Sequence, residues 1–329
     1  MTARFYEKKE AGILECGLCP HRCRLAPGGK GRCGVRGNQD GKLVLPYYGH
    51  ISSLAADPIE KKPLYHYYPG ARIVSVGFVG CSFHCPFCQN YHISSSTSAA
   101  CEVLSPEQLV AEAQRAGSIG IAYTYSEPLI HLEYVLDTAL LARRAGLKNI
   151  LVSNGYINPE PAEELLGLLD AANIDLKAFR PDFYSQEIGG ELEEVKRFLH
   201  QAAGKIHLEV TTLVIPGKNS GLEEISAAAE FLASLNPAIP YHLSAYYPAY
   251  QYNLPPTPPG LLKELAAAAR NHLHYVYLGN LSYDPAGSDT ICPGCGRALI
   301  RRRGYSTRIT GVSGGRCSGC GRPVEINGV

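Results

Sequence analysis

The sequence predicts an α/β protein built on a partial (β/α)6 TIM-like barrel, with a metal-held segment at each end. Between residues 72 and 280, short apolar runs rich in β-branched side chains alternate with amphipathic segments of helical length, which is typical of a parallel sheet covered by helices. Eleven of the twelve cysteines fall into three groups, which indicates metal ligands. Six strand–helix units fit the length better than the eight of a closed barrel.

The six units are expected in sequence along the chain. Strands are predicted at 72–80, 120–125, 149–154, 173–179, 206–215 and 239–246, with a last short strand at 274–280. Helices are predicted at 105–116, 128–146, 159–172, 190–203, 221–235 and 261–272, the first capped by Ser105. Because the carboxyl ends of barrel strands converge on one face, we expect the active site there.

Three parts are expected along the chain. Residues 1–68 are rich in Cys, Gly and Pro and show little periodicity, so they predict an irregular segment that needs a metal to fold. Residues 69–285 hold the barrel, and residues 286–329 are expected to form a zinc ribbon.

The composition excludes several classes of protein. Hydrophobic residues make up 45% of the chain and charged residues 19%, and no apolar run reaches the length of a membrane span, so neither disorder nor a transmembrane helix is expected. The net charge of +1 does not indicate a nucleic-acid or membrane partner for the whole chain. The first residues lack an apolar secretory segment, so we expect a cytoplasmic protein whose thiols stay reduced and free to bind metals.

Cys81, Cys85 and Cys88 form a C-x3-C-x2-C loop immediately after the first predicted strand. A four-iron cluster normally takes four thiolates, so three thiolates leave one iron open to a substrate or cosubstrate. The alternative is a zinc knuckle that borrows Cys101 as its fourth ligand, although zinc sites usually pair cysteines as C-x2-C. Otherwise Cys101 is expected to be a buried, unreactive thiol.

This loop resembles the one that defines the radical SAM superfamily, which follows the first strand of a partial barrel. The resemblance implies a 4Fe-4S cluster and S-adenosylmethionine (SAM), which one electron from a low-potential donor such as flavodoxin or ferredoxin cleaves to methionine and a 5'-deoxyadenosyl radical. The radical would abstract hydrogen from a substrate that the sequence does not identify. Phe87 matches the aromatic residue that the family places beside the adenine of SAM.

The same resemblance implies cosubstrate contacts at later strand ends. Glu127 of TYSEP matches the acid of the family's Gly-Gly-Glu-Pro element that meets the amino group of SAM, although Tyr125 and Ser126 replace the two glycines. The other implied contacts are Ser153 and Asn154 near the carboxylate and sugar, the pair Asp175 and Lys177, and His242 near the adenine. Each alone is equally explained as a hydrogen-bonded polar residue, but their agreement at five strand ends favours a site.

Over its whole length the chain resembles the radical SAM member of the AmmeMemoRadiSam system, a group related to pyruvate formate-lyase activating enzymes. Matching segments include CGLCPHRC, DPIEKKPLYH, GCSFHCPFCQN, SNGYI, PYHLSAYYP and the terminal CPGCG and CSGCG. Ser126 stands where that group commonly has Asn. The resemblance implies partner proteins of the Memo and AMMECR types. It also makes Glu60, Lys61, Lys62 and His66 candidates for the substrate side, in a segment otherwise interpreted as a solvated linker.

Two other functions stay open. An activating enzyme would generate a glycyl radical on a partner protein, but activases with additional cysteines usually carry them after the radical loop, whereas four precede it here. A non-catalytic metal-binding scaffold for RNA or protein is the second alternative, although a scaffold has no need of polar residues at five strand ends.

Two further metal sites are predicted in the flanking segments. The first would use Cys16, Cys19, Cys23 and Cys33, which suit either zinc or an auxiliary iron–sulfur cluster, with His21 a surface residue of that loop. The second would use the C-x2-C pairs Cys292, Cys295 and Cys317, Cys320, which are typical of a zinc ribbon. Residues 291–329 hold seven arginines and one acidic residue. We interpret the arginines as a solvated or protein-docking face rather than a nucleic-acid site.

Overall fold

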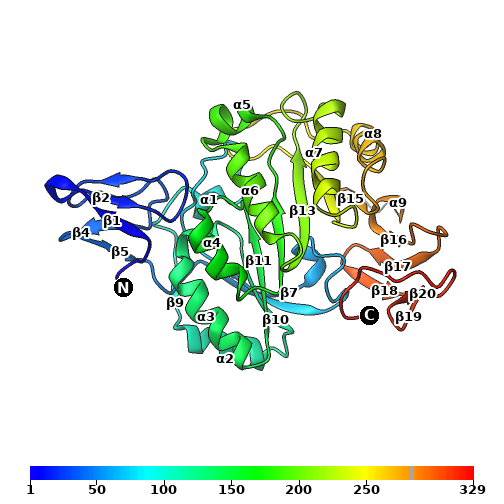
Figure 1. Cartoon of the computed structure of the whole chain (residues 1–329), viewed down its shortest axis with the longest axis horizontal. Helices are drawn as coiled ribbons and strands as arrows, with labels where there is room; N and C mark the ends of the chain where they lie inside the picture. Colours follow the sequence, from blue (N-terminus) through cyan, green and yellow to red (C-terminus); the bar gives the residue numbers. More distant parts are fainter. Residues whose placement is uncertain (282–284) are drawn as a thin grey trace.

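The centre of the molecule is a sheet whose strand order is β15-β14-β13-β12-β11-β10-β8-β7 (Figure 1). The computed structural model describes residues 1–281 and 285–329. The strands of the sheet are β7 Ser53–Pro58, β8 Arg72–Gly77, β10 Gly120–Thr124, β11 Lys148–Ser153, β12 Ala171–Asp175, β13 His207–Val214, β14 Tyr241–Ala245 and β15 Val276–Gly279. From β8 to β15 every paired neighbour runs parallel. The repeated strand–helix units predicted from the sequence are therefore confirmed.

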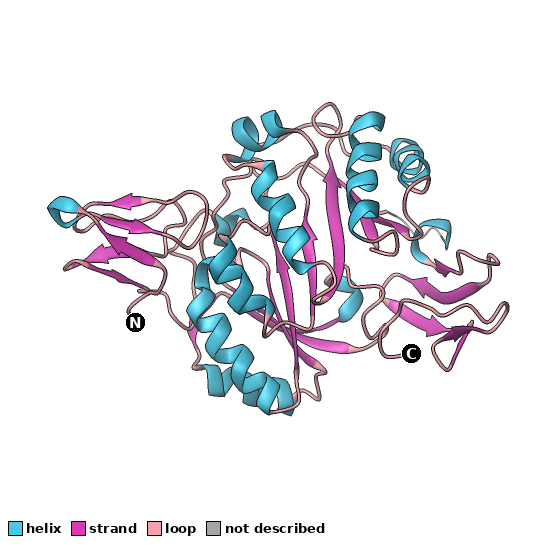
Figure 2. Ribbon diagram, viewed as in Figure 1, coloured by secondary structure: helices cyan, strands magenta, loops and turns pink. Residues whose placement is uncertain are grey.

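Helices follow the parallel strands and pack over the sheet (Figure 2). The longer ones are α2 Pro106–Arg115, α3 Leu132–Arg144, α4 Pro159–Leu166, α6 Leu192–Ala202, α7 Leu222–Leu235 and α8 Pro259–Ala269, and the short ones are α1 Tyr91–Ser94, α5 Pro181–Phe183 and α9 Pro285–Ser288. Ser105 caps α2 as expected, because its hydroxyl accepts from the Gln108 amide while the Gln108 side chain accepts from the Ser105 amide. Each long helix turns an apolar stripe toward the sheet.

The sheet does not close into a full barrel within the described residues. β7 and β15 are its two edges and do not pair with each other. The strands β8 and β10 are buried along almost their whole length, as expected for parallel strands covered on both sides. This is the partial barrel that the sequence predicted, and the carboxyl ends of its strands gather on one side.

The start of the fourth barrel strand differs from the prediction. The helix expected over 159–172 ends at Leu166, and Ala171 already belongs to β12. Gly167 follows the helix, and the Asp170 carboxylate accepts from the Asn149 amide at 2.9 Å, which ties the start of β12 to β11. An apolar run shared by a helix end and a strand start has no clear periodicity, so the boundary was not visible in the sequence.

Residues 1–68 contain regular structure, so the expectation of an irregular segment is wrong. Their strands are β1 Tyr6–Lys8, β2 Leu14–Cys16, β3 Arg24–Leu25, β4 Gly37–Gln39, β5 Lys42–Val44, β6 His50–Ile51 and β7 Ser53–Pro58; β6 pairs with β9 Glu102–Val103. Most are two or three residues long, too short for a visible alternation of side chains. β7 pairs antiparallel with β8, so the central sheet begins before residue 69.

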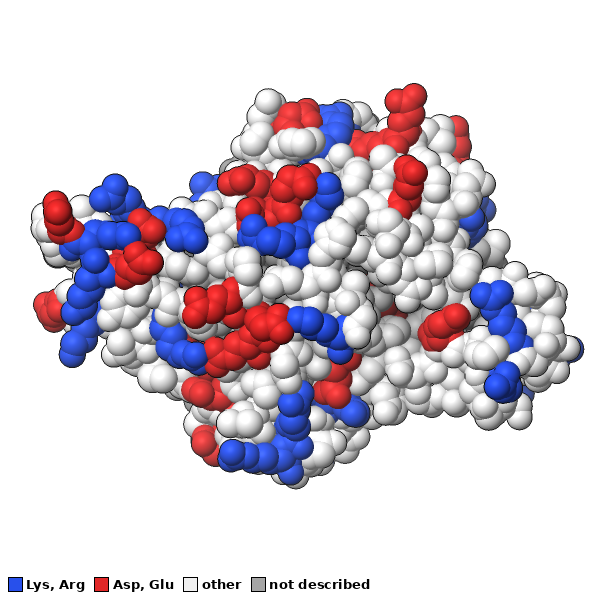
Figure 3. Space-filling view, in the orientation of Figure 1, with Lys and Arg blue, Asp and Glu red and all other residues white. Residues whose placement is uncertain are grey.

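The C-terminal lobe carries β16 Thr290–Ile291, β17 Ala298–Arg303, β18 Ser306–Ile309, β19 Val312–Ser313 and β20 Arg316–Cys317. It docks on the barrel through Arg302, which is buried and donates to the Tyr65 carbonyl at 2.6 Å and to the Thr290 hydroxyl at 2.8 Å. The basic face predicted for this tail therefore excludes Arg302, whereas its other arginines are exposed. Figure 3 shows blue side chains on this lobe.

The part of the chain that the structure describes contains no helix long and apolar enough to cross a membrane.

Candidate functional site

The loop that carries Cys81, Cys85 and Cys88 leaves the end of β8 through buried Phe78 and Val79. Gly80 is required at its start. Its backbone has φ of +79°, and a β-carbon at this position would overlap the carbonyl oxygen of Cys33. The loop is therefore held between the barrel and the N-terminal lobe.

A cavity of about 270 Å³ opens beside this loop at the carboxyl ends of the strands. All three cysteines of the loop line it. So do five residues predicted from the sequence, and they come from four different segments of the chain: Phe87, Glu127, Asn154, Asp175 and Lys177. The structure thus brings most of the predicted site residues together around one space.

Glu127 follows β10 and is buried, with both carboxylate oxygens held by donors. Oε1 accepts from the Ser153 hydroxyl at 2.7 Å and from the Leu129 amide at 3.0 Å, and Oε2 accepts from the Asn154 amide at 2.9 Å. Burial raises the pKa of Glu127 to about 7, against the lowering effect of these hydrogen bonds. The carboxyl group is therefore poised to ionise fully when a cation binds.

Ser153 and Asn154, at the end of β11, have different placements. Ser153 lies behind Glu127 and orients it, and is not among the lining residues of the cavity. Asn154 lines the cavity, and its side-chain amide donates to the Ser82 hydroxyl at 3.0 Å and lies 3.8 Å from the Cys81 sulfur. The amide therefore connects the cysteine loop to the third barrel strand.

Asp175 and Lys177 form an ion pair at the end of β12, with 2.7 Å between Lys177 Nζ and Asp175 Oδ2. Burial opposes the charge on Lys177, but the Asp175 carboxylate, together with the negative charge of Cys85 when it is a thiolate, outweighs burial and raises the lysine's pKa. The pair places one fixed cation and one fixed anion at the wall of the cavity.

Phe87 is buried at the cavity wall, with ring centroids 6.0 Å from Phe183 and 5.7 Å from Tyr252. Its position between the second and third cysteines gives the cavity an apolar side suited to a flat heterocycle.

The structure does not bring His242 to this cavity. His242 is the second residue of β14, so its side chain lies deep in the barrel, where its Nε2 lies 2.6 Å from the Glu209 carboxylate. The strand continues to Ala245, and Ser244 reaches the cavity instead. The expectation that His242 lies beside a cosubstrate is therefore corrected. His242 is near the start of β14, whereas the residues that reach the cavity lie near the carboxyl end of the strand.

Sequence reasoning missed several lining residues. They are Pro63, Phe83, Gln89, Asn90, Ser94, Thr211, Leu213, Ser244 and Asn280. Ser244 and Asn280 are polar residues at the ends of the last two parallel strands. Their position at the strand ends could have identified them in the sequence as cavity residues. Asn90 is held by its donation to the Tyr125 carbonyl at 2.8 Å. Ser126, which replaces a common Asn, donates to the Phe78 carbonyl at 2.9 Å and so still joins β10 to the cysteine loop.

The residues of the loop fit a metal cluster. Burial raises the pKa of the Cys85 thiol to about 12 and that of Cys81 well above its usual value, so thiolates here would need a metal beside them. The three sulfurs face a cavity that also offers a carboxylate, an amide and an ion pair. Cys101 lines neither this cavity nor the adjoining one of about 350 Å³, so it is not placed to be a fourth ligand.

The polar segment before β8 is mostly structural. Glu60 accepts from the Gly70 amide at 2.8 Å and from the Thr307 hydroxyl at 2.7 Å, which links it to the C-terminal lobe. His66 is buried against the Tyr277 hydroxyl at 2.6 Å. Lys62 is buried and lies 2.8 Å from Asp57, which also pairs with Lys61. Apart from the exposed Lys61, these residues are not a solvated linker, and none of the four lines the cavity.

The C-terminal cysteines form a compact group. The Sγ atoms of Cys292, Cys295, Cys317 and Cys320 all lie within 4.8 Å of one another. The pairs Cys292–Cys320 and Cys295–Cys317 are separated by 3.7 and 3.6 Å. Four thiolates around one metal at about 2.3 Å would lie about 3.8 Å apart. This quartet could hold a single metal ion.

The N-terminal cysteines Cys16, Cys19, Cys23 and Cys33 line one small cavity of about 20 Å³. His21 also lines this cavity, and its Nε2 lies 2.9 Å from the Ser82 carbonyl oxygen. His21 is thus half-buried against the cysteine loop and not a surface residue.

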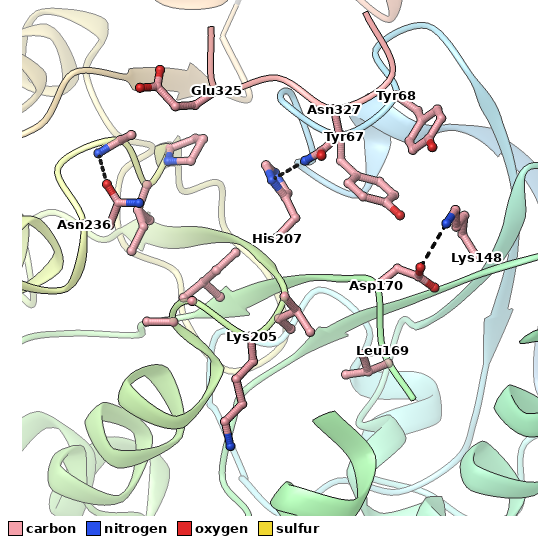
Figure 4. Close-up of a pocket in the computed structure, with 17 residues that line it drawn as sticks. Tyr67, Tyr68, Lys148, Leu169, Asp170, Lys205, His207, Asn236, Glu325 and Asn327 are labelled. Carbon is pink, nitrogen blue, oxygen red and sulfur yellow. Dashed lines mark hydrogen bonds and ion pairs between the residues drawn. The ribbon is translucent and has the colours of Figure 1, made fainter. Parts of the chain in front are cut away.

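A larger hollow of about 500 Å³ lies at the opposite ends of the strands (Figure 4). Lys148 and Asp170 pair across 3.1 Å at its wall, and the Asn327 side chain lies 3.0 Å from His207 Nδ1. None of the residues predicted for the site lines it. Its size alone does not make it the site, because the chemical groups converge elsewhere.

Comparison with known proteins agrees with this geometry. Residues 75–232 match the Radical SAM superfamily. A protein of Methanocaldococcus jannaschii, described as uncharacterized protein MJ0808, is 38% identical over 98% of both chains. The chain therefore belongs to the radical SAM superfamily, a group of enzymes that use a 4Fe-4S cluster and SAM.

More distant relatives are the pyruvate formate-lyase-activating enzyme of Listeria monocytogenes and the pyruvate formate-lyase 1-activating enzyme of Escherichia coli. Both are 24% identical, over 54% and 53% of this chain and over 78% and 75% of their own lengths. The crystal structure of Streptococcus suis SuiB bound to S-adenosylmethionine superposes with a TM-score of 0.51 and 11% identity, covering 62% of this chain and 49% of SuiB. This last likeness shows the shared fold.

Proposed function

We propose that the protein reductively cleaves SAM at a 4Fe-4S cluster held by Cys81, Cys85 and Cys88, and that the resulting 5'-deoxyadenosyl radical abstracts hydrogen from a substrate. The observation that carries the proposal is the convergence of these three thiols with Glu127, Asn154 and the Asp175–Lys177 pair on one cavity at the strand ends. When bound, the cluster supplies the single electron that breaks the C–S bond of SAM; a flavodoxin or ferredoxin would supply that electron.

The polar residues of the cavity would hold the amino acid part of SAM. Glu127 accepts hydrogen bonds on both oxygens and faces the cavity, so its carboxylate would bind the ammonium group. Asn154 and Lys177 offer donors suited to the carboxylate and ribose of SAM. Phe87 would pack on the adenine. Ser153 would act through Glu127 by fixing its orientation.

The cleavage is tested by one ligand variant and a matched control. Wild-type protein reconstituted without oxygen and reduced with dithionite should convert SAM into 5'-deoxyadenosine. Cys85→Ala should lose this conversion, while Cys101→Ala, which removes a thiol outside the cavity, should retain it. Conversion at the wild-type rate in Cys85→Ala would disprove the proposed cluster site.

We further propose that the protein is of the AmmeMemoRadiSam type and acts with partners of the Memo and AMMECR kinds. The match to the Methanocaldococcus protein extends over 98% of both chains, which supports a family defined by the whole chain and not by the barrel alone. Co-purification of tagged protein from its own cells tests the partners. The free cysteines throughout the described chain suit a reducing compartment, so we place the protein in the cytoplasm.

A second candidate is activation of a glycyl radical enzyme, which the names of the Listeria and Escherichia relatives favour. These relatives match only about half of this chain, so they do not account for its flanking segments. An organic radical signal in electron paramagnetic resonance on mixing with a candidate partner and SAM would establish this activity. Deuterium transfer into 5'-deoxyadenosine from a labelled small molecule would instead favour a metabolite substrate.

For the C-terminal quartet we propose zinc. The sulfur separations of 3.6 and 3.7 Å suit one tetrahedral ion with no open position. Such a site would be structural.

A further inference from the structure

Two segments beside the proposed site carry no charged side chain. Residues 73–101, which hold the cysteine loop and α1, contain no Asp, Glu, Lys or Arg, and neither do residues 231–262, which hold β14 and the loop after it. Burial explains this for the strands β8 and β14. It does not explain residues 94–101 and 247–256, which are all exposed or half-buried, in a chain of which 19% is charged.

The two segments meet beside the cysteine loop. The rings of Tyr91 and Tyr250 stack, with centroids 4.8 Å apart and planes 11° apart, and the Gln251 amide donates to the Pro86 carbonyl at 2.9 Å. Among the described residues, only these two segments line the adjoining cavity of about 350 Å³. We call the exposed residues around it and beside the SAM cavity the neutral rim: Tyr91, Ser95, Tyr247, Tyr250 and Gln251.

The neutral rim presents three tyrosine rings to solvent. Tyr91 is 43% exposed, Tyr247 47% and Tyr250 42%. The Tyr247 hydroxyl donates to the carbonyl of Asn280, which lines the SAM cavity, at 2.7 Å. Tyr250 has a φ of +56°, a conformation that is strained for a residue with a side chain. Exposed tyrosines with few charged neighbours are typical of the centre of a protein–protein interface.

The chemistry of the neutral rim does not suit other kinds of substrate. A nucleic acid needs Lys or Arg to neutralise its phosphates, and the two segments contain neither. A small metabolite is held in an enclosed cavity by converging polar groups, so rings exposed outside the cavity would not contact it. A polypeptide would cover these rings. Its docked part should be uncharged, because the rim offers no opposite charge to compensate a buried one.

We propose that the substrate is a polypeptide that docks an uncharged segment on the neutral rim and presents it to the open side of the SAM cavity. This assignment rests on the proposed function, which places SAM against the cysteine loop and leaves the substrate to approach from outside. The two cavities share the three cysteines, Phe83 and Ser94 as lining residues. A chain on the rim would therefore lie next to the place where the radical forms.

The source of the abstracted hydrogen tests the assignment. Its own cells, grown in deuterated medium and extracted in ordinary water, yield an extract that ultrafiltration divides into macromolecules and small molecules. With reconstituted protein, dithionite and unlabelled SAM, one deuterium should enter 5'-deoxyadenosine from the macromolecules. Prior digestion with a proteinase should abolish this transfer, and ribonuclease should not. Transfer from the small molecules alone, or transfer that ribonuclease abolishes, would overturn the assignment.

A rim variant and a matched control locate the contact. Tyr91→Ser and Tyr250→Ser together should lower the fraction of 5'-deoxyadenosine that carries deuterium about tenfold, as the loss of aromatic anchors does in interfaces. Tyr305→Ser, which removes a 55% exposed tyrosine of the C-terminal lobe, should keep the wild-type fraction. A double variant that matches wild type would overturn docking on the rim.

Total 5'-deoxyadenosine, measured in the same samples, separates the two proposals. If the wild-type protein forms 5'-deoxyadenosine but takes no deuterium from the macromolecules, the polypeptide substrate is wrong and the proposed function stands. If it forms no 5'-deoxyadenosine at all, the proposed function is wrong, and the assignment that rests on it falls too.

Discussion

At the scale of single residues, the burial of Glu127 predicts how the affinity for SAM changes with pH. Its carboxyl group is fully enclosed, and burial raises its pKa to about 7 although three donors hold it. Below that pH the group is mostly neutral and cannot pair with an ammonium group. Above it the carboxylate is present before any ligand arrives.

We therefore expect the affinity for SAM to depend on pH. Raising the pH from 6 to 8 should increase the association constant about tenfold, because the fraction of ionised Glu127 rises by that factor around a pKa of 7. Isothermal titration calorimetry on the reconstituted protein measures the association constant for SAM at each pH. Glu127→Gln should bind SAM weakly at both pH values, and its affinity should not change with pH. If the affinity of this variant still rises with pH, another group is responsible for the titration.

At the scale of elements, the contact between the N-terminal lobe and the cysteine loop rests on Gly80. Gly146 provides a matched comparison, because its φ of +75° is close to the +79° of Gly80 while no atom lies within 4 Å of the position of its β-carbon. A side chain at either site carries the same backbone strain of about 1 kcal/mol. Only at Gly80 would the added β-carbon also overlap a neighbouring backbone atom, the Cys33 carbonyl oxygen.

Gly80→Ala should accordingly lower the Tm more than Gly146→Ala and reduce the iron retained after reconstitution. Differential scanning fluorimetry and iron analysis measure the two effects. Equal losses in the two variants would mean that the lobe and the loop pack independently.

The sequence predicted the barrel strands and long helices from residue 72 onward, and it located the cysteines and several polar residues of the cavity wall. It did not predict the strands of residues 1–52, which are too short to alternate visibly, and it also missed the six-residue strand β7. Nor did it predict that His242 would face Glu209, because which residue of β14 reaches the strand end depends on the register between β13 and β14. The contact of Arg302 with Tyr65 joins residues 237 positions apart, and no local pattern encodes it.

At the scale of the whole molecule, the C-terminal lobe has few buried contacts to hold it together beside the proposed metal on its four cysteines. Its own core is small, consisting of Cys292, Leu299, Ile300, Cys317 and Ile326. Two of these five are metal-binding candidates. The metal should therefore supply much of the folding free energy of this lobe.

Cys292→Ser should make the chain beyond about residue 286 sensitive to trypsin, because the exposed arginines of the lobe become accessible cleavage sites. Mass spectrometry of the limited digest locates the cuts, and Cys101→Ser should digest like wild type. The barrel cluster should survive in both variants. If the lobe of Cys292→Ser loses its metal and still resists trypsin, the contacts of Arg302 with the barrel are enough to keep the lobe folded.

The order of strands in the central sheet has a consequence for how the protein is made. Because β8 and β10 to β15 lie side by side in the order in which the chain encodes them, each strand emerging from the ribosome finds its neighbour already in place. The C-terminal lobe must reach back: Arg302 donates to the Tyr65 carbonyl at 2.6 Å, and the Asn327 amide donates to the His66 carbonyl at 2.8 Å. These bonds form only after the C-terminal lobe has been made, so the nascent barrel waits with residues 65–68 uncovered, and a product truncated before the lobe would expose this surface to chaperones and proteases.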